Sequence, residues 1–135
     1  MGKGMVSWPG LYYAEFLMSQ FMLILFEKPG DFAKMSPEEI QKVIEKYSAW
    51  SAKLAMAGKL AGGHKLKEEG GKQLAQGRDK LSVVDGPYAE TKEVIGGIFL
   101  LNAENYDEAV RLSSDCPHLA YGRIEIRQID PMAGG

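Results

Sequence analysis

Residues 20–27 read QFMLILFE and are apolar at every interior position. A strand with one face in water alternates apolar and polar residues, whereas a strand covered on both faces is apolar throughout. The stretch therefore predicts a central strand that is covered on both faces. IGGIFLLNA, residues 95–103, has consecutive apolar positions of the same kind and predicts a second such strand.

A helix is predicted shortly after the first strand. Ser36 supplies an N-cap, Pro37 suits the first helical position, and Glu39 completes a capping box. The residues that follow recur at three- and four-residue spacing and form one apolar stripe, made by Ile40, Val43, Ile44, Tyr47, Trp50 and Leu54. Gly58 stands where a left-handed residue would end the helix.

The remaining elements complete a repeating order of strands and helices. Asn105 and Glu108 form a capping pair for a second, shorter helix. Further strands are expected at residues 60–66, 72–76, 80–85 and 122–129, the first with glycines that indicate a bulge or a close backbone approach. The order β-α-β-(β)-β-α-β predicts an α+β fold, a ferredoxin-like split βαβ layer in which two helices cover one face of an antiparallel sheet.

Two helices on one face leave the other face of this sheet without a cover. The strands at residues 20–27 and 95–103 are nevertheless apolar on both faces. A large apolar face is rarely left bare, and two-fold homodimers are the commonest oligomers. We therefore expect a homodimer in which two sheets face each other.

Composition bounds the class of protein. The chain has 135 residues, a size typical of one domain, and a formal net charge of -2. We expect an N-terminal extension at residues 1–18, a domain at 19–131 and a tail at 132–135. Lys and Arg are scattered among Asp and Glu and form no basic stripe, which argues against nucleic-acid binding.

Location is predicted from cysteine usage and hydropathy. Cys116 is the single cysteine, so no disulfide can form within the chain, and a reducing compartment is permitted. The longest apolar run, residues 21–26, is far shorter than the roughly twenty residues of a membrane-spanning helix. Residues 1–18 lack the charge pattern and cleavage site of a signal peptide. We expect a cytoplasmic protein that has no membrane association.

The connection before the last apolar strand is unusually long and charged. Residues 83–97 read VVDGPYAETKEVIGG. A hairpin needs about two to five residues to reverse direction, so the stretch from Gly86 to Val94 exceeds what a turn requires. The excess of ionisable groups suggests a site.

Several stretches together resemble a known family. They are FMLILFEKPGD at 21–31, MSPEE at 35–39, AGKLAGGHKL at 57–66, VVDGPYAETKEVIGGIFLLNA at 83–103, DEA at 107–109 and GRIEIRQI at 122–129. Over residues 20–130 the chain resembles the YCII-related, or DGPF-domain, proteins, with Tyr88 where the name-giving Phe usually stands. The resemblance implies a ferredoxin-like fold that pairs into a dimeric α/β barrel, and it supplies no substrate. The N-terminal extension and the polar tract KEEGGKQLAQGRD depart from the family pattern.

The charged connection gives the first candidate site. Asp85 lies at the sharp corner that Gly86 and Pro87 enforce, and it is the candidate general base. His64 is the candidate proton-transfer partner, because a neutral imidazole can take and return a proton near neutral pH. The candidate ligand-binding residues beside them are Tyr88, Glu90 and Lys92. The alternative is that Asp85 accepts hydrogen bonds from loop amides while the other charges are solvated, and that His64 is a strand-edge histidine.

The last strand gives the second candidate set. Arg123, Glu125 and Arg127 share the face opposite the helices, where two guanidinium groups can hold a carboxylate ligand. An interfacial set of salt bridges, with Arg123 paired to Glu125 across a two-fold axis, is the alternative reading. Cys116 and His118 lack the spacing of a metal site, and we interpret His118 as a loop residue. No metal and no cofactor are predicted.

These observations predict an uncharacterised YCII-related protein that binds a small molecule. General acid-base catalysis on an anionic or aromatic metabolite is the leading hypothesis for its action. A non-catalytic module that binds a ligand or a protein partner is the alternative. Whether the chain is an enzyme stays open at this point.

Overall fold

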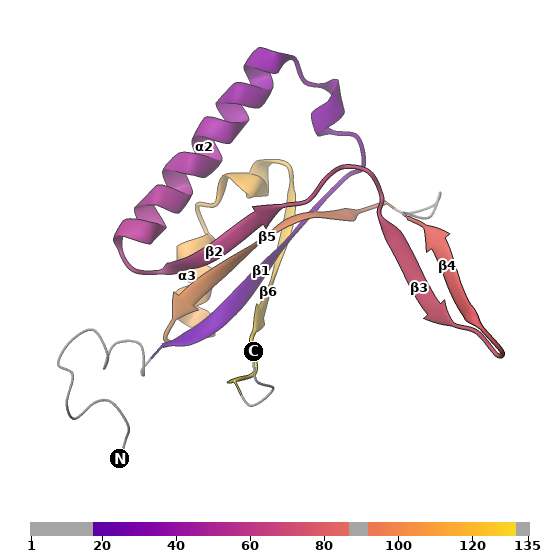
Figure 1. Cartoon of the computed structure of the whole chain (residues 1–135). Helices are drawn as coiled ribbons and strands as arrows, with labels where there is room; N and C mark the ends of the chain where they lie inside the picture. The colour runs from indigo at the N-terminus through magenta and orange to yellow at the C-terminus, as the bar shows by residue number, and fades with distance from the viewer. Residues whose placement is uncertain (1–17, 87–91, 132–135) are drawn as a thin grey trace.

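The computed structural model describes residues 18–86 and 92–131 (Figure 1). The predicted order of elements is confirmed: β1 (Ser19–Glu27), α2 (Pro37–Met56), β2 (Leu60–Lys65), β3 (Lys72–Gln76), β4 (Leu81–Asp85), β5 (Val94–Ala103), α3 (Tyr106–Ser113) and β6 (Gly122–Gln128). Two short 3-10 helices, η2 (Phe32–Lys34) and η3 (Pro117–Ala120), lie between them. None of the helices in these two described ranges is long and apolar enough to cross a bilayer.

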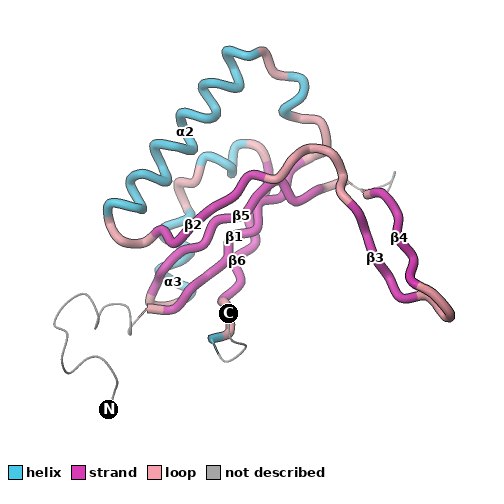
Figure 2. The backbone as a smooth tube through the Cα atoms, in the orientation of Figure 1, coloured by secondary structure: helices cyan, strands magenta, loops and turns pink. Residues whose placement is uncertain are grey.

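Four strands form one antiparallel sheet in the order β2-β5-β1-β6 (Figure 2). The two longest apolar strands, β1 and β5, are therefore central. Each βαβ unit is split by a strand of the other unit, which is the arrangement of a ferredoxin-like α+β fold. The fold class predicted from the sequence is confirmed.

The strands β3 and β4 pair only with each other and form a hairpin that projects away from the main sheet (Figure 1). Every residue of β4 is exposed. Leu74, Leu81 and Val83 fall on one face of the hairpin by register and are 63%, 50% and 55% exposed. Two-stranded hairpins are marginally stable in isolation, so this arm is a candidate contact surface.

The long helix begins at the predicted capping box. The Ser36 hydroxyl accepts from the Glu39 amide at 3.1 Å, and the Glu39 carboxylate accepts from the Ser36 amide at 2.8 Å. Such reciprocal bonds satisfy two amides that a helix start leaves without partners. After the helix, Gly58 has a φ of 74°, a left-handed conformation that glycine adopts at little cost.

The core lies between the helices and one face of the sheet. From β1, alternate residues Phe21, Leu23 and Leu25 point to this face and are buried. Leu23 and Leu25 belong to a cluster with Trp50 and Leu54 of α2, while Phe21 packs in a second cluster that includes Ala109 of α3. Both helices therefore cover the same face, which we call the helix face.

The opposite face of the sheet, which we call the open face, is apolar at its centre. By register, Met22 and Ile24 of β1 share this face with Ile98 and Leu100 of β5, and all are only partly buried. The sequence predicted that the central strands would be apolar on both faces, and they are. Within one chain, the fully buried apolar side chains of these two strands, such as Leu23 and Leu101, lie on the helix face.

Candidate functional site

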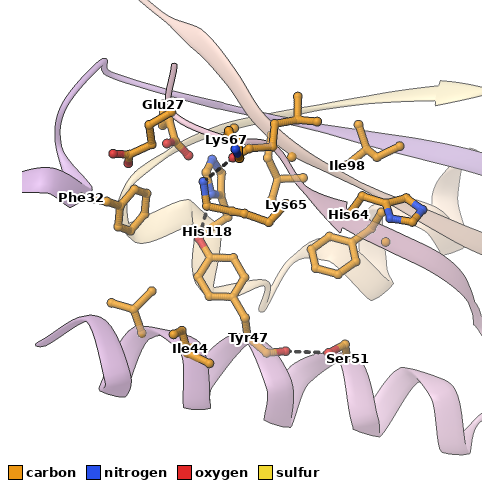
Figure 3. Close-up of a pocket in the computed structure, with 18 of the residues that line it drawn as sticks. Glu27, Phe32, Ile44, Tyr47, Ser51, His64, Lys65, Lys67, Ile98 and His118 are labelled. Carbon is orange, nitrogen blue, oxygen red and sulfur yellow. Dashed lines mark hydrogen bonds between the residues drawn. The ribbon is translucent and has the colours of Figure 1, made fainter. Parts of the chain in front are cut away.

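A cavity of about 750 Å³ lies on the helix face, beneath the first half of α2 (Figure 3). Its walls come from several elements that are far apart in the sequence. The apolar walls include Leu25, Phe32, Ile40, Val43, Ile44 and Phe99. Cavities of this size, largely apolar with a few polar groups, are typical of small-molecule sites.

The cavity exists because the apolar stripe of α2 is longer than the core beneath it. At the C-terminal half of the helix, Trp50 and Leu54 are 5% and 3% exposed and pack in the core. At the N-terminal half, Ile44 is 51% exposed although it continues the same stripe. The first half of α2 therefore covers a hollow, and its apolar side chains form the wall of that hollow.

Glu27, the last residue of β1, is the most unusual group in this cavity. It follows Phe21, Leu23 and Leu25 on the helix face and is only 6% exposed. Among the described residues, no hydrogen bond or ion pair to its carboxylate is found. Burial raises the pKa of this carboxyl above its ordinary value of 4.5, while Lys65 opposes the shift through space and Glu68 and Asp31 add to it.

Tyr47 and His118 form a hydrogen-bonded pair beside this carboxyl. Figure 3 shows the Tyr47 side chain rising from α2 toward the His118 ring. The Tyr47 hydroxyl lies 2.8 Å from His118 Nδ1, and His118 Nε2 lies 2.7 Å from the carbonyl oxygen of Phe26. His118 is 1% exposed, so these two contacts hold its ring from both sides.

Burial keeps both members of this pair uncharged. It lowers the pKa of His118 below 6.5, although the bond to the Phe26 carbonyl partly opposes that shift and Lys65 adds to it. It also raises the pKa of the Tyr47 phenol, with smaller contributions from Cys116, Glu27 and Tyr121 in the same direction. At neutral pH the pair is therefore a neutral imidazole and a neutral phenol.

Two glycines make room for these polar side chains. Gly96 is the extra residue of a β-bulge, because Leu25 pairs with Gly97 while Phe26 pairs with Ile95. A Cβ atom at Gly96 would overlap the Glu27 carboxylate. A Cβ atom at Gly122 would overlap the Phe26 carbonyl and lie 3.1 Å from His118 Nε2. Bulges often re-aim side chains beside functional sites, and the one at Gly96 lies directly under Glu27.

Lysines supply positive charge near the polar end of the cavity. Lys65 and Lys67 both line it. The Lys65 ammonium donates to the Leu66 carbonyl at 2.9 Å and lies 5.9 Å from the centre of the Phe32 ring. Both lysines are exposed, so they can meet an anionic group of a ligand at the edge of the cavity.

The predicted residues of the charged connection lie elsewhere. Asp85 is at the end of β4, where its exposed carboxylate pairs with Lys72 at 2.5 Å. His64 is exposed on β2 and pairs by register with Ile98, which places its side chain on the open face. His64 also borders the cavity, and Figure 3 shows its ring apart from Glu27 and His118. Asp85 and His64 are therefore not brought together within one chain.

The other predicted ligand-binding residues divide into two groups. Tyr88 and Glu90 lie outside the described residues, and Lys92 is exposed just before β5. Arg123, Glu125 and Arg127 lie on the open face, as predicted, where Glu125 is 3.9 Å from Arg123 and 3.3 Å from Arg127. In residues 18–86 and 92–131, no group of at least three His, Cys, Asp or Glu side chains is arranged to hold a metal ion.

Sequence reasoning missed Glu27, Tyr47 and His118 as site residues. The sequence predicts Tyr47 only as part of the apolar stripe and His118 as a loop residue, whereas His118 is buried in η3. One signal was present for Glu27, because strand alternation places it on the same face as Phe21, Leu23 and Leu25. No local pattern links the other two residues, since the fold alone brings them together.

Comparisons with known proteins agree with the resemblance. The model of the YCII-related domain matches residues 19–133. The chain belongs to the YCII-related family. An uncharacterised protein of Rhizobium meliloti (strain 1021) is 32% identical over 97 residues, which cover 70% of this chain and 78% of that protein. Membership of the YCII-related family fixes the fold, and it leaves the substrate to be argued from the cavity.

Proposed function

We propose that this chain binds a small anionic or aromatic metabolite in the cavity under α2 and acts on it by general acid-base proton transfer. The observation that carries the proposal is Glu27, a residue that is 6% exposed, lines the cavity and has no hydrogen-bond or ion-pair partner for its carboxylate among the described residues. Burial disfavours the charged form of this carboxyl and raises its pKa. A titratable group with a displaced pKa in a cavity is a typical catalytic candidate.

The lining of the cavity supports the proposed class of ligand. The walls are apolar side chains, with Phe32 and Phe99 available to pack against a ring. The polar groups gather at Glu27, Tyr47 and His118, and Lys65 stands near them. A compound with an apolar or aromatic body and a polar, negatively charged end would match this arrangement.

We further propose that the chain acts as a homodimer through its open face. Ile24, Ile98 and Leu100 leave the centre of that face apolar and only partly buried. A second copy would cover it and would give each sheet two buried faces. The hairpin β3–β4 carries further exposed apolar side chains that fit the same role. A reducing location such as the cytoplasm belongs to the proposal, since the single cysteine cannot form a disulfide within the chain.

A second candidate site on the open face has one observation in its favour. Arg123 binds both oxygens of Glu93 at 3.0 Å and lies 4.0 Å from the centre of the Phe26 ring. In a dimer, this arginine and its neighbours would line the space between two sheets, together with the predicted residues Asp85 and Lys92. This arrangement favours recognition of a ligand or partner over catalysis, because Glu93 and Glu125 are already paired with arginines and Asp85 with Lys72.

A thermal-shift screen with a metabolite library separates the two candidate sites. The proteins are the wild type, Tyr47→Phe, Asp85→Asn and the matched control Tyr106→Phe. Tyr106 is a suitable control because it does not line the cavity and its hydroxyl accepts from the Gln128 amide. A ligand present at 100 times its Kd stabilises a protein by about 2.7 kcal/mol, which such a screen detects.

We expect the stabilisation by hits to be lost in Tyr47→Phe and retained in Asp85→Asn and Tyr106→Phe. If the stabilisation by hits is lost only in Asp85→Asn, the ligand binds at the charged connection and not in the cavity. Hits that stabilise all four proteins equally would contradict both sites.

A further inference from the structure

The hydrogen positions of the Tyr47–His118 pair follow from the geometry. The Phe26 carbonyl can only accept, so the 2.7 Å contact requires a hydrogen on His118 Nε2. A neutral imidazole then carries a lone pair on Nδ1, and this lone pair must accept the Tyr47 hydroxyl hydrogen at 2.8 Å. The backbone therefore fixes the tautomer of His118, and His118 fixes the direction of the Tyr47 hydroxyl.

This arrangement makes the Tyr47 oxygen an acceptor toward the cavity. Its single hydrogen is committed to His118, so the remaining lone pairs can accept only from a ligand hydroxyl or N–H group. The Glu27 carboxyl offers the opposite property when protonated, since it can then donate a proton to a ligand. The cavity therefore presents an acceptor linked to a base, and a carboxyl that donates in its protonated form, both beside apolar walls.

We propose that the cavity takes the enol of an aromatic-sized 2-keto acid and converts it to the keto form. The inference rests on the proposed function and names its substrate class and reaction. The enol hydroxyl is the donor that Tyr47 requires, and the ring would lie against the apolar wall that includes Phe32 and Phe99. The carboxylate of the acid would face the ammonium groups of Lys65 and Lys67.

The reaction is a shift of one proton with no other reagent. The enol O–H bond breaks, its proton passes to the Tyr47 oxygen, and the former Tyr47 proton passes to His118 Nδ1. The C–O bond becomes C=O while the electron pair of the C=C bond takes the Glu27 proton and forms a C–H bond. Glu27 is left as a carboxylate and His118 as an imidazolium, and exchange of one proton each with water restores both.

The enol form of phenylpyruvate is the test substrate, because its conversion to the keto form is followed by absorbance. We expect the wild type to accelerate ketonisation above the rate in buffer. Tyr47→Phe and Glu27→Gln each remove one proton-transfer group with little change of shape, and each should lose at least about 100-fold in kcat/KM. The matched control Tyr106→Phe should keep the wild-type rate.

A second readout comes from the reaction in D₂O. Glu27 would deliver deuterium to one face of the enol, so the new C–H position should be labelled in a single configuration, whereas ketonisation in buffer labels both. If the protein accelerates the reaction but the deuterium is found in both configurations, Glu27 does not deliver the proton to the enol carbon. Acceleration that survives intact in Tyr47→Phe would overturn the relay.

The failure of this inference differs from the failure of the proposed function. If phenylpyruvate stabilises the wild type but not Tyr47→Phe against heat, and no acceleration occurs, the enol conversion is wrong and binding in the cavity stands. If phenylpyruvate neither binds nor reacts, the inference is overturned, and the library screen alone decides the proposed function.

Discussion

On the helix face of the sheet, Glu27 is 6% exposed and has no hydrogen-bond or ion-pair partner among the described residues. On the open face, the Glu125 side chain is 38% exposed and lies between Arg123 and Arg127. Exposed ion pairs contribute little to stability and cost little to form. Burial of Glu27 beside the cavity instead disfavours its charged form and raises the pKa of its carboxyl. The contrast is between the exposed ion pairs of Glu125 and the Glu27 carboxylate, which lines a cavity and has no such partner among the described residues.

The two faces also differ in their apolar residues. On the helix face, Leu23, Trp50 and Leu54 are fully packed, and only the space below the first half of α2 is hollow. On the open face, Ile24 and Ile98 are partly exposed across the centre of the sheet. The helix face therefore forms a core with a pocket, and the partly exposed apolar centre of the open face is what the proposed dimer would cover.

The largest expected effect compares the packed and hollow halves of α2. Leu54→Ala removes a side chain that is 3% exposed, and we expect it to lower the free energy of unfolding by about 2–5 kcal/mol. Ile44→Ala, on the wall of the cavity and 51% exposed, should cost less than about 1 kcal/mol. Denaturant unfolding measures both. Equal losses would mean that the first half of α2 is packed and that no hollow exists.

The next effect tests the open face as an interface. Ile24→Lys places a charge at its centre beside Glu125, which is the cross-strand partner of Ile24 and can neutralise the charge within one chain. In a dimer the same charge is buried, and we expect a loss of about 3 kcal/mol, on the order of 100-fold in the dimer dissociation constant. Analytical ultracentrifugation measures the change.

Ile44→Lys is the matched control for this experiment, because it makes the same substitution at the rim of the cavity. The Ile44→Lys variant should have the same dimer dissociation constant as the wild type. Either of two results would contradict the proposal that the open face is the dimer interface: a wild type that is monomeric at high concentration, or an Ile24→Lys variant that dimerises normally.

A smaller effect is expected from the glycine under Glu27. Gly96→Ala would push a Cβ atom into the carboxylate, so we expect a loss of about 1–3 kcal/mol in unfolding free energy together with loss of ligand binding. Gly62→Ala is the control, since its Cβ would lie 3.8 Å from Leu100 in ordinary contact. If the two variants behave alike, Glu27 is not held as described.

The smallest effect is a pH dependence that belongs to Glu27. Its pKa is raised in the folded protein, so the protonated form contributes stability below about pH 4.5, and this contribution is lost as the pH rises through the raised pKa. Glu27→Gln stays uncharged at every pH. The stability of this variant relative to the wild type should therefore grow as the pH rises above about 4.5.

Unfolding free energies of both proteins across a pH series measure this difference, in which the titrations of all other groups cancel. A difference in unfolding free energy that does not vary with pH would show that folding does not raise the pKa of Glu27. A difference that shrinks as the pH rises would place a positive partner beside it.

The fold could be predicted because its signals are local. The capping box at Ser36 and Glu39, the alternation in β6 and the apolar runs of β1 and β5 each depend on neighbouring residues only. The open face was predicted by the same means, since strand alternation places Arg123, Glu125 and Arg127 together.

The site could not be predicted in this way. Glu27, Tyr47 and His118 come from β1, α2 and η3, and packing alone brings them together. Tyr47 and His118 are separated by 71 positions, and each fits an ordinary structural role when it is considered alone. The density of ionisable groups in the charged connection predicts a site there. In the described part of that connection, Asp85 forms an exposed ion pair with Lys72. The predicted catalytic roles of Asp85 and His64 stay predictions.

The central claim is that ligands bind on the helix face, in the cavity under α2. An NMR map of backbone amide shifts on titration with a hit from the metabolite screen tests it most directly. We predict that the largest shifts surround Glu27, Tyr47, Gly96 and His118, which come from four separate elements. Shifts confined to Arg123, Glu125 and Arg127 on the open face would contradict binding in the cavity.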